Sequence, residues 1–282
     1  MKKADGSAGG QLSRPIGVFD SGIGGLTVVR ALLDRLPHEN IVYFGDTARV
    51  PYGPKSAQVV REYAAQDVEF LLSKQVKMIV VACNTVSAVA LDVVQRRAHV
   101  PVVDVIHPSS KFAVAATKNK RVGVVGTVGT IASKAYVHAI RQLDPAVQVF
   151  GKPCPLFVPI AEEGWANHKV AALVAREYLF PLTLERIDTL ILGCTHYPLL
   201  KQVIRDAVDG AVTLIDSGEA SAAAVEHDLE VEGLKNPSTE RPNVDFYVSD
   251  IPEKFTEVGE RFLGRTLGRV RRADPYSFGR RS

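Results

Sequence analysis

Two cysteines in this chain occupy matching positions, each directly behind a short apolar run and each followed within two residues by threonine. The runs are residues 78–82, which precede Cys83, and residues 190–193, which precede Cys194. Branched apolar runs of this length are typical of buried parallel strands, and open α/β sheets bind ligands at the carboxyl ends of such strands. Both thiols are therefore predicted to face a crevice instead of a core.

The whole chain alternates such runs with longer amphipathic stretches, which predicts parallel sheets flanked by helices. Strands are expected at residues 16–20, 41–45, 78–83, 100–106, 121–126, 147–151, 189–194, 212–215 and 244–248. Helices are expected at residues 26–36, 57–74, 86–98, 131–143, 170–180 and 199–208. Ser56 suits a helix N-cap, and Pro198 suits a first helical turn. The predicted fold class is α/β with doubly wound parallel sheets.

A faint internal repeat divides the chain. Residues 16–22 resemble residues 122–128, and each segment is followed at a similar separation by one of the cysteine runs. Two similar domains related by a pseudo-two-fold axis would bring their sheet ends face to face, so the active site is expected in the cleft between them. The predicted parts are a flexible tail (1–14), a first α/β domain (15–106 plus 217–264), a second α/β domain (107–216) and a basic C-terminal tail (265–282).

The composition is that of a globular protein and argues against several functions. Of the 282 residues 46% are hydrophobic, and the formal net charge is only +3. Much of this charge comes from arginines in the last stretch, so no nucleic-acid partner is expected. No signal peptide and no bilayer-crossing run is found, which favours a cytoplasmic protein with reduced thiols and no membrane partner. The three cysteines form no CxxC pair, and no metal site is expected.

The two cysteines carry the strongest functional signal. A free cysteine usually only packs in a core, and this alternative would win for either thiol taken alone. Two in matching contexts favour function, because each precedes a predicted helix whose dipole favours a thiolate. Thiols on opposite sides of one ligand suit removal of a proton from one face of a carbon and its return to the other. Cys154, between two prolines, lacks this context and is expected to be structural.

A glycine-rich turn, residues 19–25, follows the first expected strand. A dinucleotide-binding loop is the alternative, but GxGxxG is not matched and Asp20 would repel a pyrophosphate. An aspartate followed by Ser21 is better suited to hold an ammonium group and to relay a proton.

Three further elements are candidates. The proline- and glycine-rich loop around Tyr52 could bind a carboxylate through its backbone N–H groups. Within it, Asp46 and Arg49 taken alone predict a structural ion pair. His196 could donate a proton or steady the Cys194 thiolate, although an inert capping role is the alternative. Glu162 could orient that histidine, but its pattern alone favours a solvated helix residue.

Taken together, these motifs closely resemble the glutamate racemases, cofactor-independent enzymes of the aspartate/glutamate racemase superfamily. The resemblance extends from about residue 16 to residue 264. It is carried by Gly17-Val18-Phe19-Asp20-Ser21-Gly22, Pro51-Tyr52-Gly53, Ala82-Cys83-Asn84-Thr85, Gly126-Thr127 with Thr130, Val158-Pro159-Ile160 leading to Glu162, and Gly193-Cys194-Thr195-His196-Tyr197-Pro198.

The resemblance implies a site and a reaction. Cys83 and Cys194 would be the catalytic acid/bases that interconvert L-glutamate and D-glutamate, with no cofactor. Asp20 would assist Cys83, His196 would assist Cys194 with Glu162 behind it, and Asp46 would support catalysis. Substrate contacts would come from Asp20, Ser21, Pro51, Tyr52, Gly53, Asn84, Thr85, Thr127, Thr130, Thr195 and His196. The same resemblance implies a homodimer and the supply of D-glutamate for peptidoglycan in a bacterial cytoplasm.

Other functions stay open at this point. Aspartate racemase or another member of the superfamily would share both thiols. An amino-acid-binding module with idle cysteines, or a redox protein using Cys83 and Cys194 as a disulfide, would differ in class.

Overall fold

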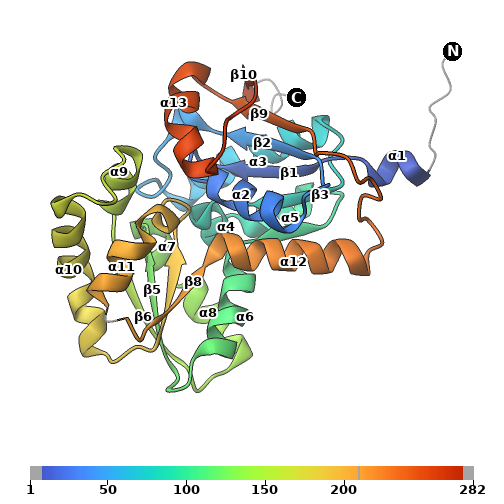
Figure 1. Ribbon diagram of the computed structural model, residues 1–282. Helices are drawn as coiled ribbons and strands as arrows, with labels where there is room; N and C mark the ends of the chain where they lie inside the picture. The colour runs from blue at the N-terminus through green and yellow to red at the C-terminus, as the bar shows by residue number, and fades with distance from the viewer. Residues whose placement is uncertain (1–7, 209, 276–282) are drawn as a thin grey trace, which may run out of the picture.

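The computed structural model describes residues 8–208 and 210–275, which form two parallel sheets with helices around them (Figure 1). The first sheet has the strand order β10-β9-β2-β1-β3-β4, and the second has the order β6-β5-β7-β8. The strands are β1 (Ile16–Asp20), β2 (Ile41–Gly45), β3 (Met78–Val81), β4 (Val102–Asp104), β5 (Arg121–Gly126), β6 (Gln148–Pro153), β7 (Thr189–Gly193), β8 (Thr213–Asp216), β9 (Val244–Val248) and β10 (Val270–Arg272). The α/β fold class with two parallel sheets is confirmed.

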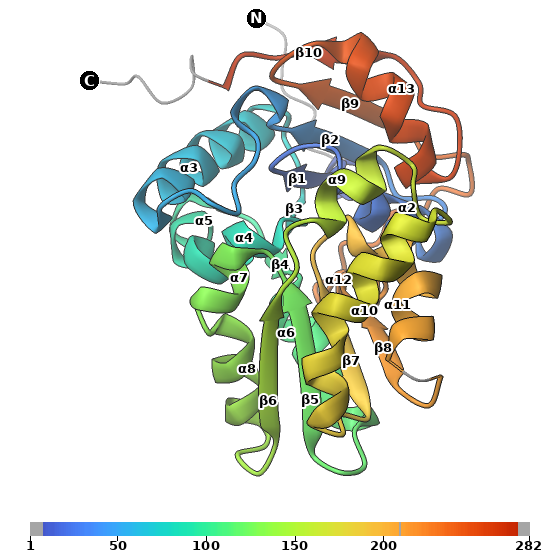
Figure 2. The same ribbon diagram turned by 90° about the vertical axis from the view of Figure 1, so that its left-hand side faces the viewer.

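The two sheets share one winding order, which is the structural form of the repeat in the sequence. In each, the second strand lies beside the first, and the third and fourth follow on the other side, with every pairing parallel. The first sheet extends this order with β9 and β10. Figure 2 shows β5 and β6 pointing from the second sheet toward the first. The carboxyl strand ends, where α/β proteins bind ligands, therefore face the junction between the sheets.

The helices cover the sheets and connect the two halves. They are α1 (Ala8–Leu12), α2 (Leu26–Arg35), α3 (Ala57–Ser73), α4 (Asn84–Val89), α5 (Leu91–Arg97), α6 (Ile106–Ala116), α7 (Val128–Ala132), α8 (Ala135–Leu143), α9 (Phe157–Glu162), α10 (Lys169–Leu184), α11 (Lys201–Ala207), α12 (Ser217–Val231) and α13 (Pro252–Leu263), with 3-10 turns η1 (Thr47–Arg49) and η2 (Tyr197–Leu200). Helix α12 lies along the boundary of the two halves and packs against both α2 and α6 (Figure 1). None of the helices in the described part of the chain is long and apolar enough to cross a membrane.

Several helix boundaries differ from the expectation. The helix expected at 86–98 begins earlier and is interrupted at Ala90, whose ψ of 6° ends α4. The helix expected at 131–143 is two helices, because Lys134 adopts a left-handed conformation with φ 58°. Helix α10 continues past residue 180 to Leu184 with Pro181 inside it. Ser56 is the N-cap of α3 as expected, and its side chain accepts from the Val59 N–H at 3.4 Å.

The expected tails contain ordered elements within the described residues. Val270–Arg272 forms β10 beside β9, where Arg271 Nη1 lies 2.9 Å from Asp245 Oδ1. Part of the basic run that was expected to be a solvated extension therefore pairs with a strand, β9, and with an acidic residue, Asp245, that are distant in sequence. At the other end, the carbonyl of Leu12 in α1 accepts from Lys77 Nζ at 2.6 Å. Residues 1–7 and 276–282 of the expected tails lie outside the described residues.

Candidate active site

A pocket lies between the two sheets and is built from the carboxyl ends of strands in both. The first sheet contributes Ser21, after β1, and Cys83, after β3, while the second contributes Thr127, after β5, and Cys194, after β7. The full lining is Ser21, Gly22, Ile23, Val50, Pro51, Tyr52, Gly53, Cys83, Asn84, Thr85, Thr127, Val158, Glu162, Cys194, Thr195 and His196. The equivalent strands of the repeat, β3 and β7, supply the two thiols.

Both cysteines are nearly enclosed yet reach the same pocket. Cys83 is 4% exposed and is the N-cap residue of α4, and Cys194 is 5% exposed and directly follows β7. Neither is in a disulfide. The expectation that two thiols from separate halves meet at one site therefore agrees with the geometry, whereas two separate buried cores would have excluded it.

The environment of Cys83 favours the protonated thiol. Burial, followed by the negative charge of Asp20, raises the pKa of Cys83 to about 12, despite hydrogen bonds from Val86 and Ser21 that favour the thiolate. Asp20 is itself 1% exposed. Burial raises the pKa of Asp20, opposed by the positive charge of His196 and by the backbone N–H groups of the turn. At neutral pH Cys83 is thus a thiol.

The environment of Cys194 contains a cation. His196 Nδ1 lies 3.9 Å from Cys194 Sγ, and His196 Nε2 lies 2.9 Å from Glu162 Oε1. Burial lowers the pKa of His196, but hydrogen bonds to Cys194 and Glu162 and their negative charges outweigh it and raise the value to about 10. The imidazolium is thus held between the Cys194 sulfur and the Glu162 carboxylate. The two sulfurs therefore lie in different electrostatic environments, Cys83 beside a carboxylate and Cys194 beside a cation.

Helix α13 packs against His196 on the side away from the pocket. The ring of Phe262 meets that of His196 edge-on, with centroids 5.1 Å apart. This apolar contact buries the histidine, so its charge acts through a low-dielectric medium on Cys194.

Hydrogen-bond donors for an anion also line the pocket. Asn84 Oδ1 accepts from the Tyr136 hydroxyl at 2.7 Å, and the buried Asn84 Nδ2 has no partner among the described residues. Beside it, the Thr85 hydroxyl lies 3.0 Å from that of Thr127, which lies 2.9 Å from that of Thr130. A buried donor left unpaired costs free energy until a ligand accepts from it, so this group is suited to a carboxylate.

The loop of residues 50–53 joins the two halves across the pocket. The carbonyl of Gly53 accepts from the Gly129 N–H at 3.0 Å, at the start of α7 in the other half. The Tyr52 hydroxyl points away from the pocket and donates to Asp46. The bond between Val50 and Pro51 is cis.

Most of the expected site residues lie in this pocket, and three lie behind it. Asp20, Asp46 and Thr130 are absent from the lining: Asp20 acts electrostatically on Cys83, Asp46 binds Tyr52, and Thr130 binds Thr127. The expected Asp46–Arg49 ion pair is present. Sequence reasoning missed four lining residues as site members, namely Gly22, Ile23, Val50 and Val158. Their one signal was adjacency to the motifs, because apolar side chains carry no chemistry of their own.

Comparison with known proteins decides the family. A model of the Asp/Glu/Hydantoin racemases matches residues 25–225. The chain belongs to the Asp/Glu/Hydantoin racemase family. It is 54% identical over 258 residues to a glutamate racemase of Syntrophus aciditrophicus, covering 92% of this chain and 96% of the relative. It is 50% identical over 257 residues to one of Geobacter metallireducens, covering 91% and 95%.

Solved structures of racemases agree with the fold along almost the full length. A glutamate racemase of Francisella tularensis, crystallised with D-glutamate, superposes with a TM-score of 0.89 at 43% identity, covering 95% of this chain and 100% of that one. A glutamate racemase of Thermus thermophilus, crystallised with β-chloro-D-alanine, has a TM-score of 0.85 at 45% identity, covering 94% and 98%. The predicted resemblance to this family is confirmed.

Proposed function

We propose that this racemase-family chain interconverts L-glutamate and D-glutamate, using Cys83 and Cys194 as its two acid/base groups and no cofactor. The observation that carries the proposal is one pocket lined by two cysteines in opposite electrostatic environments. The curated glutamate racemases, about half identical to this chain over nearly its full length, support glutamate as the substrate.

The reaction moves one proton off the substrate and another onto it. With Cα between the sulfurs, the Cys194 thiolate takes the Cα proton of one enantiomer and becomes a thiol. The electron pair stays on Cα, and the Cys83 thiol then gives its proton to the opposite face and becomes a thiolate. For the other enantiomer the roles reverse. Each sulfur thus ends in the state from which the other began.

The acidity of the Cα–H is the main obstacle. An amino-acid Cα–H is a very weak acid, and without a cofactor there is no conjugated electron sink. Rate must come from positioning and from fixed charges in an enclosed site. Enclosure of both thiols and the His196 imidazolium beside Cys194 support this reading.

The substrate's charged groups have complementary partners around the thiols. We assign its carboxylates to Asn84, Thr85, Thr127 and Thr195 and to the backbone of the Pro51-Tyr52-Gly53 loop. We assign its ammonium to Ser21 in the lining, with the carboxylate of Asp20 directly behind it; the buried Asp20 Oδ1 has no hydrogen-bond partner among the described residues. Asp46 and Thr130 would act from behind the lining.

The wider role is a further part of the proposal. We propose that the chain works in the cytoplasm as a homodimer and supplies D-glutamate for peptidoglycan. Three large apolar side chains of α10, Leu173, Phe180 and Leu184, are each more than 60% exposed and give a partner subunit a surface to cover.

Circular dichroism tests the function directly. Purified protein freed of metal and given no cofactor should bring either L-glutamate or D-glutamate to zero ellipticity. The same assay with L-aspartate separates a glutamate enzyme from an aspartate enzyme. Tight binding of glutamate without any loss of ellipticity would instead identify a binding module. If oxidation removed the free thiols of Cys83 and Cys194 and reduction restored them fully, a redox pair would be supported.

Gly53→Ala should raise the KM for glutamate by about threefold to tenfold. A Cβ at this position would lie 3.0 Å from Thr127 Cβ. Because hydrogen bonds to the hydroxyls of Thr85 and Thr130 hold Thr127 in place, the loop must move. Gly268→Ala is the matched control, because nothing lies within 4 Å of its added Cβ. An unchanged KM in Gly53→Ala would show that the loop does not hold the substrate.

A further inference from the structure

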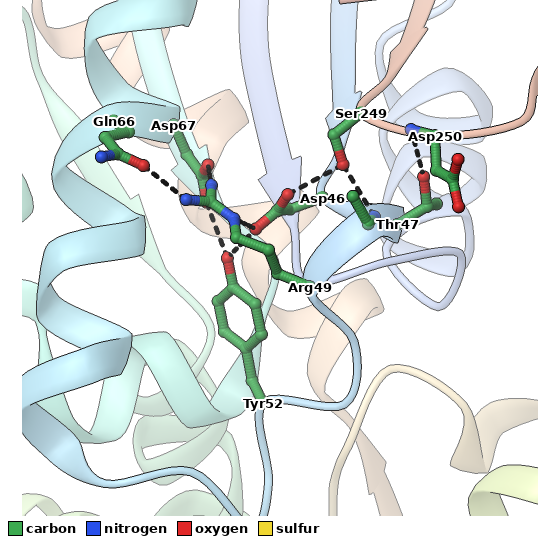
Figure 3. Close-up of polar contacts among 9 residues, drawn as sticks. Asp46, Thr47, Arg49, Tyr52, Gln66, Asp67, Ser249 and Asp250 are labelled. Atoms are coloured by element: carbon green, nitrogen blue, oxygen red, sulfur yellow. Dashed lines mark hydrogen bonds and ion pairs between the residues drawn. The ribbon is translucent and has the colours of Figure 1, made fainter. Parts of the chain in front are cut away.

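A cluster of buried polar side chains lies directly behind the Tyr52 loop (Figure 3). It contains Asp46 after β2, Arg49 in η1, Tyr52, and Asp67 in the middle of α3. Both aspartate side chains are 0% exposed and that of Arg49 is 6% exposed. Arg49, Asp67 and their contacts have no role in the two-cysteine reaction itself, yet two carboxylates and one guanidinium are costly to bury.

Asp46 accepts from every group that it faces. Its Oδ2 accepts from Arg49 Nε and from the Tyr52 hydroxyl, and its Oδ1 accepts from Ser249 Oγ at 2.8 Å. Ser249 Oγ in turn accepts from the Ala48 N–H at 2.8 Å, so its hydrogen is free to point at Asp46 (Figure 3). In all three of these contacts the Asp46 side chain acts as an acceptor.

Asp67 cannot be satisfied in the same way. Its Oδ1 accepts from Arg49 Nη2 at 3.0 Å, and its Oδ2 lies 3.3 Å from the Tyr52 hydroxyl oxygen. A tyrosine hydroxyl has one hydrogen, and in Tyr52 it is directed to the closer Asp46. An ionised Asp67 would therefore hold a bare oxygen against the lone pairs of Tyr52. A proton on Asp67 Oδ2 turns this contact into a hydrogen bond that Asp67 donates.

The charges point the same way. Arg49 supplies one positive charge against two aspartates, so a proton on Asp67 makes the cluster neutral. Burial and the charge of Asp46 raise the pKa of Asp67 well above its ordinary value, and the attraction of Arg49 and the hydrogen bond with Tyr52 oppose this rise only in part. The guanidinium stays charged, because Asp67 and Asp46 offset its burial and raise the pKa of Arg49.

We propose that Asp67 is a neutral, hydrogen-bond-donating positioning residue for racemisation, which fixes the Tyr52 hydroxyl between itself and Asp46 and so holds the 50–53 loop in its substrate-binding place. The inference rests on the proposed function. Asp67 does not line the pocket; it acts through Tyr52, whose loop does, and whose neighbour Gly53 is bonded across the cleft to Gly129. The cluster thus links α3 and the end of β9 to the substrate loop.

The test compares two substitutions of Asp67. In Asp67→Asn the amide oxygen can accept from Arg49 and the NH₂ can donate to Tyr52, which reproduces a protonated aspartate. We expect KM and kcat within about threefold of the unsubstituted protein. Asp67→Ala removes the donor, and we expect KM for glutamate to rise about tenfold with a smaller change in kcat. The loop would no longer position the substrate, whereas both catalytic thiols would remain in place. If Asp67 is instead ionised and acts as a charge partner of Arg49, Asp67→Asn should raise KM as much as Asp67→Ala does, and this result would overturn the proposal.

A matched control is available on the surface. Asp92, in α5, pairs with Arg61 of α3 as Asp67 pairs with Arg49, but it is exposed and lies outside the pocket. Asp92→Ala should leave KM unchanged. A tenfold rise in KM in this control would mean that the loss of any carboxylate near α3 is enough, and the proposal would fail.

Infrared spectroscopy measures the proton without any turnover. At neutral pH the difference spectrum between the unsubstituted protein and Asp67→Asn should contain the carbonyl band of a protonated carboxylic acid. The band of an ionised carboxylate in its place would overturn the proposal. Because this measurement needs no substrate, it tests the protonation of Asp67 independently of the proposed function. The proposed function fails only if the unsubstituted protein does not racemise glutamate.

Discussion

Cys83→Ala and Cys194→Ala should each lower the racemisation of glutamate by about a thousandfold or more. Each substitution removes the proton donor or acceptor on one face of Cα, and a positioned acid or base is worth roughly 10² to 10⁴ in rate. Neither side chain supports the fold by a disulfide, so the pocket itself should survive. Turnover by circular dichroism, from either enantiomer, is the measurement. Near-normal turnover in either variant would disprove the two-cysteine scheme.

Proton exchange gives the same prediction a sharper form. In D₂O the unsubstituted enzyme should place deuterium in the product well before it appears in the remaining substrate. Cys83→Ala keeps the Cys194–His196 pair, so it should still exchange the Cα proton of the enantiomer whose Cα–H faces Cys194, without inversion. Cys194→Ala should not exchange that enantiomer. Exchange of both enantiomers by either variant would contradict the assignment of one sulfur to each face.

Cys154→Ala is the internal control for both experiments. Cys154 is also free and 0% exposed, but it packs in the core and does not line the pocket. Its replacement should leave the rate and the exchange pattern intact. A thousandfold loss in this variant would show that removing any buried thiol disturbs the fold.

The parts of the fold that the sequence could predict are those determined locally. A branched apolar run bounded by polar residues identifies a buried strand without knowledge of its neighbours, and the strands expected at 16–20, 41–45, 121–126 and 244–248 are confirmed with the same limits. The positions of Cys83 and Cys194 followed from such runs and from the repeat. Because β3 and β7 lie in different sheets, bringing their ends to one site also needed the expected pseudo-two-fold relation of the two halves.

The parts that escaped prediction depend on contacts distant in sequence. Strand β10 exists because Val270–Arg272 finds the edge of β9, and the three-residue run has no strand signal of its own. Asp67 lies in a helix and belongs to no motif of the sequence, so only the approach of Arg49 and Tyr52 gives it a role. Lys134 breaks a helix by a backbone conformation that its residue type does not favour.

His196→Asn should lower kcat by about a hundredfold. The amide of asparagine can still donate to Cys194 from the place of Nδ1, but the positive charge that stabilises the thiolate is gone. The loss should be larger in the direction in which Cys194 removes the proton. Since L- and D-glutamate have equal free energies in water, kcat/KM must stay equal in the two directions, so the asymmetry appears in kcat and KM separately. Progress curves from each pure enantiomer measure both.

The pH dependence gives this prediction its sign. Because the raised pKa of His196 lies at about 10, the imidazolium is present through neutral pH and is lost as the pH rises through that value. The unsubstituted enzyme should therefore exceed His196→Asn in rate across neutral pH, and this advantage should shrink above about pH 10, where the imidazolium is lost. Glu162→Gln is the matched comparison: it keeps a hydrogen-bonding partner at His196 Nε2 but removes a carboxylate whose side chain is 46% exposed, and solvent already screens that charge. It should cost about tenfold or less. Equal and small losses in the two variants, with unshifted pH profiles, would show that the histidine cation does not hold the Cys194 thiolate.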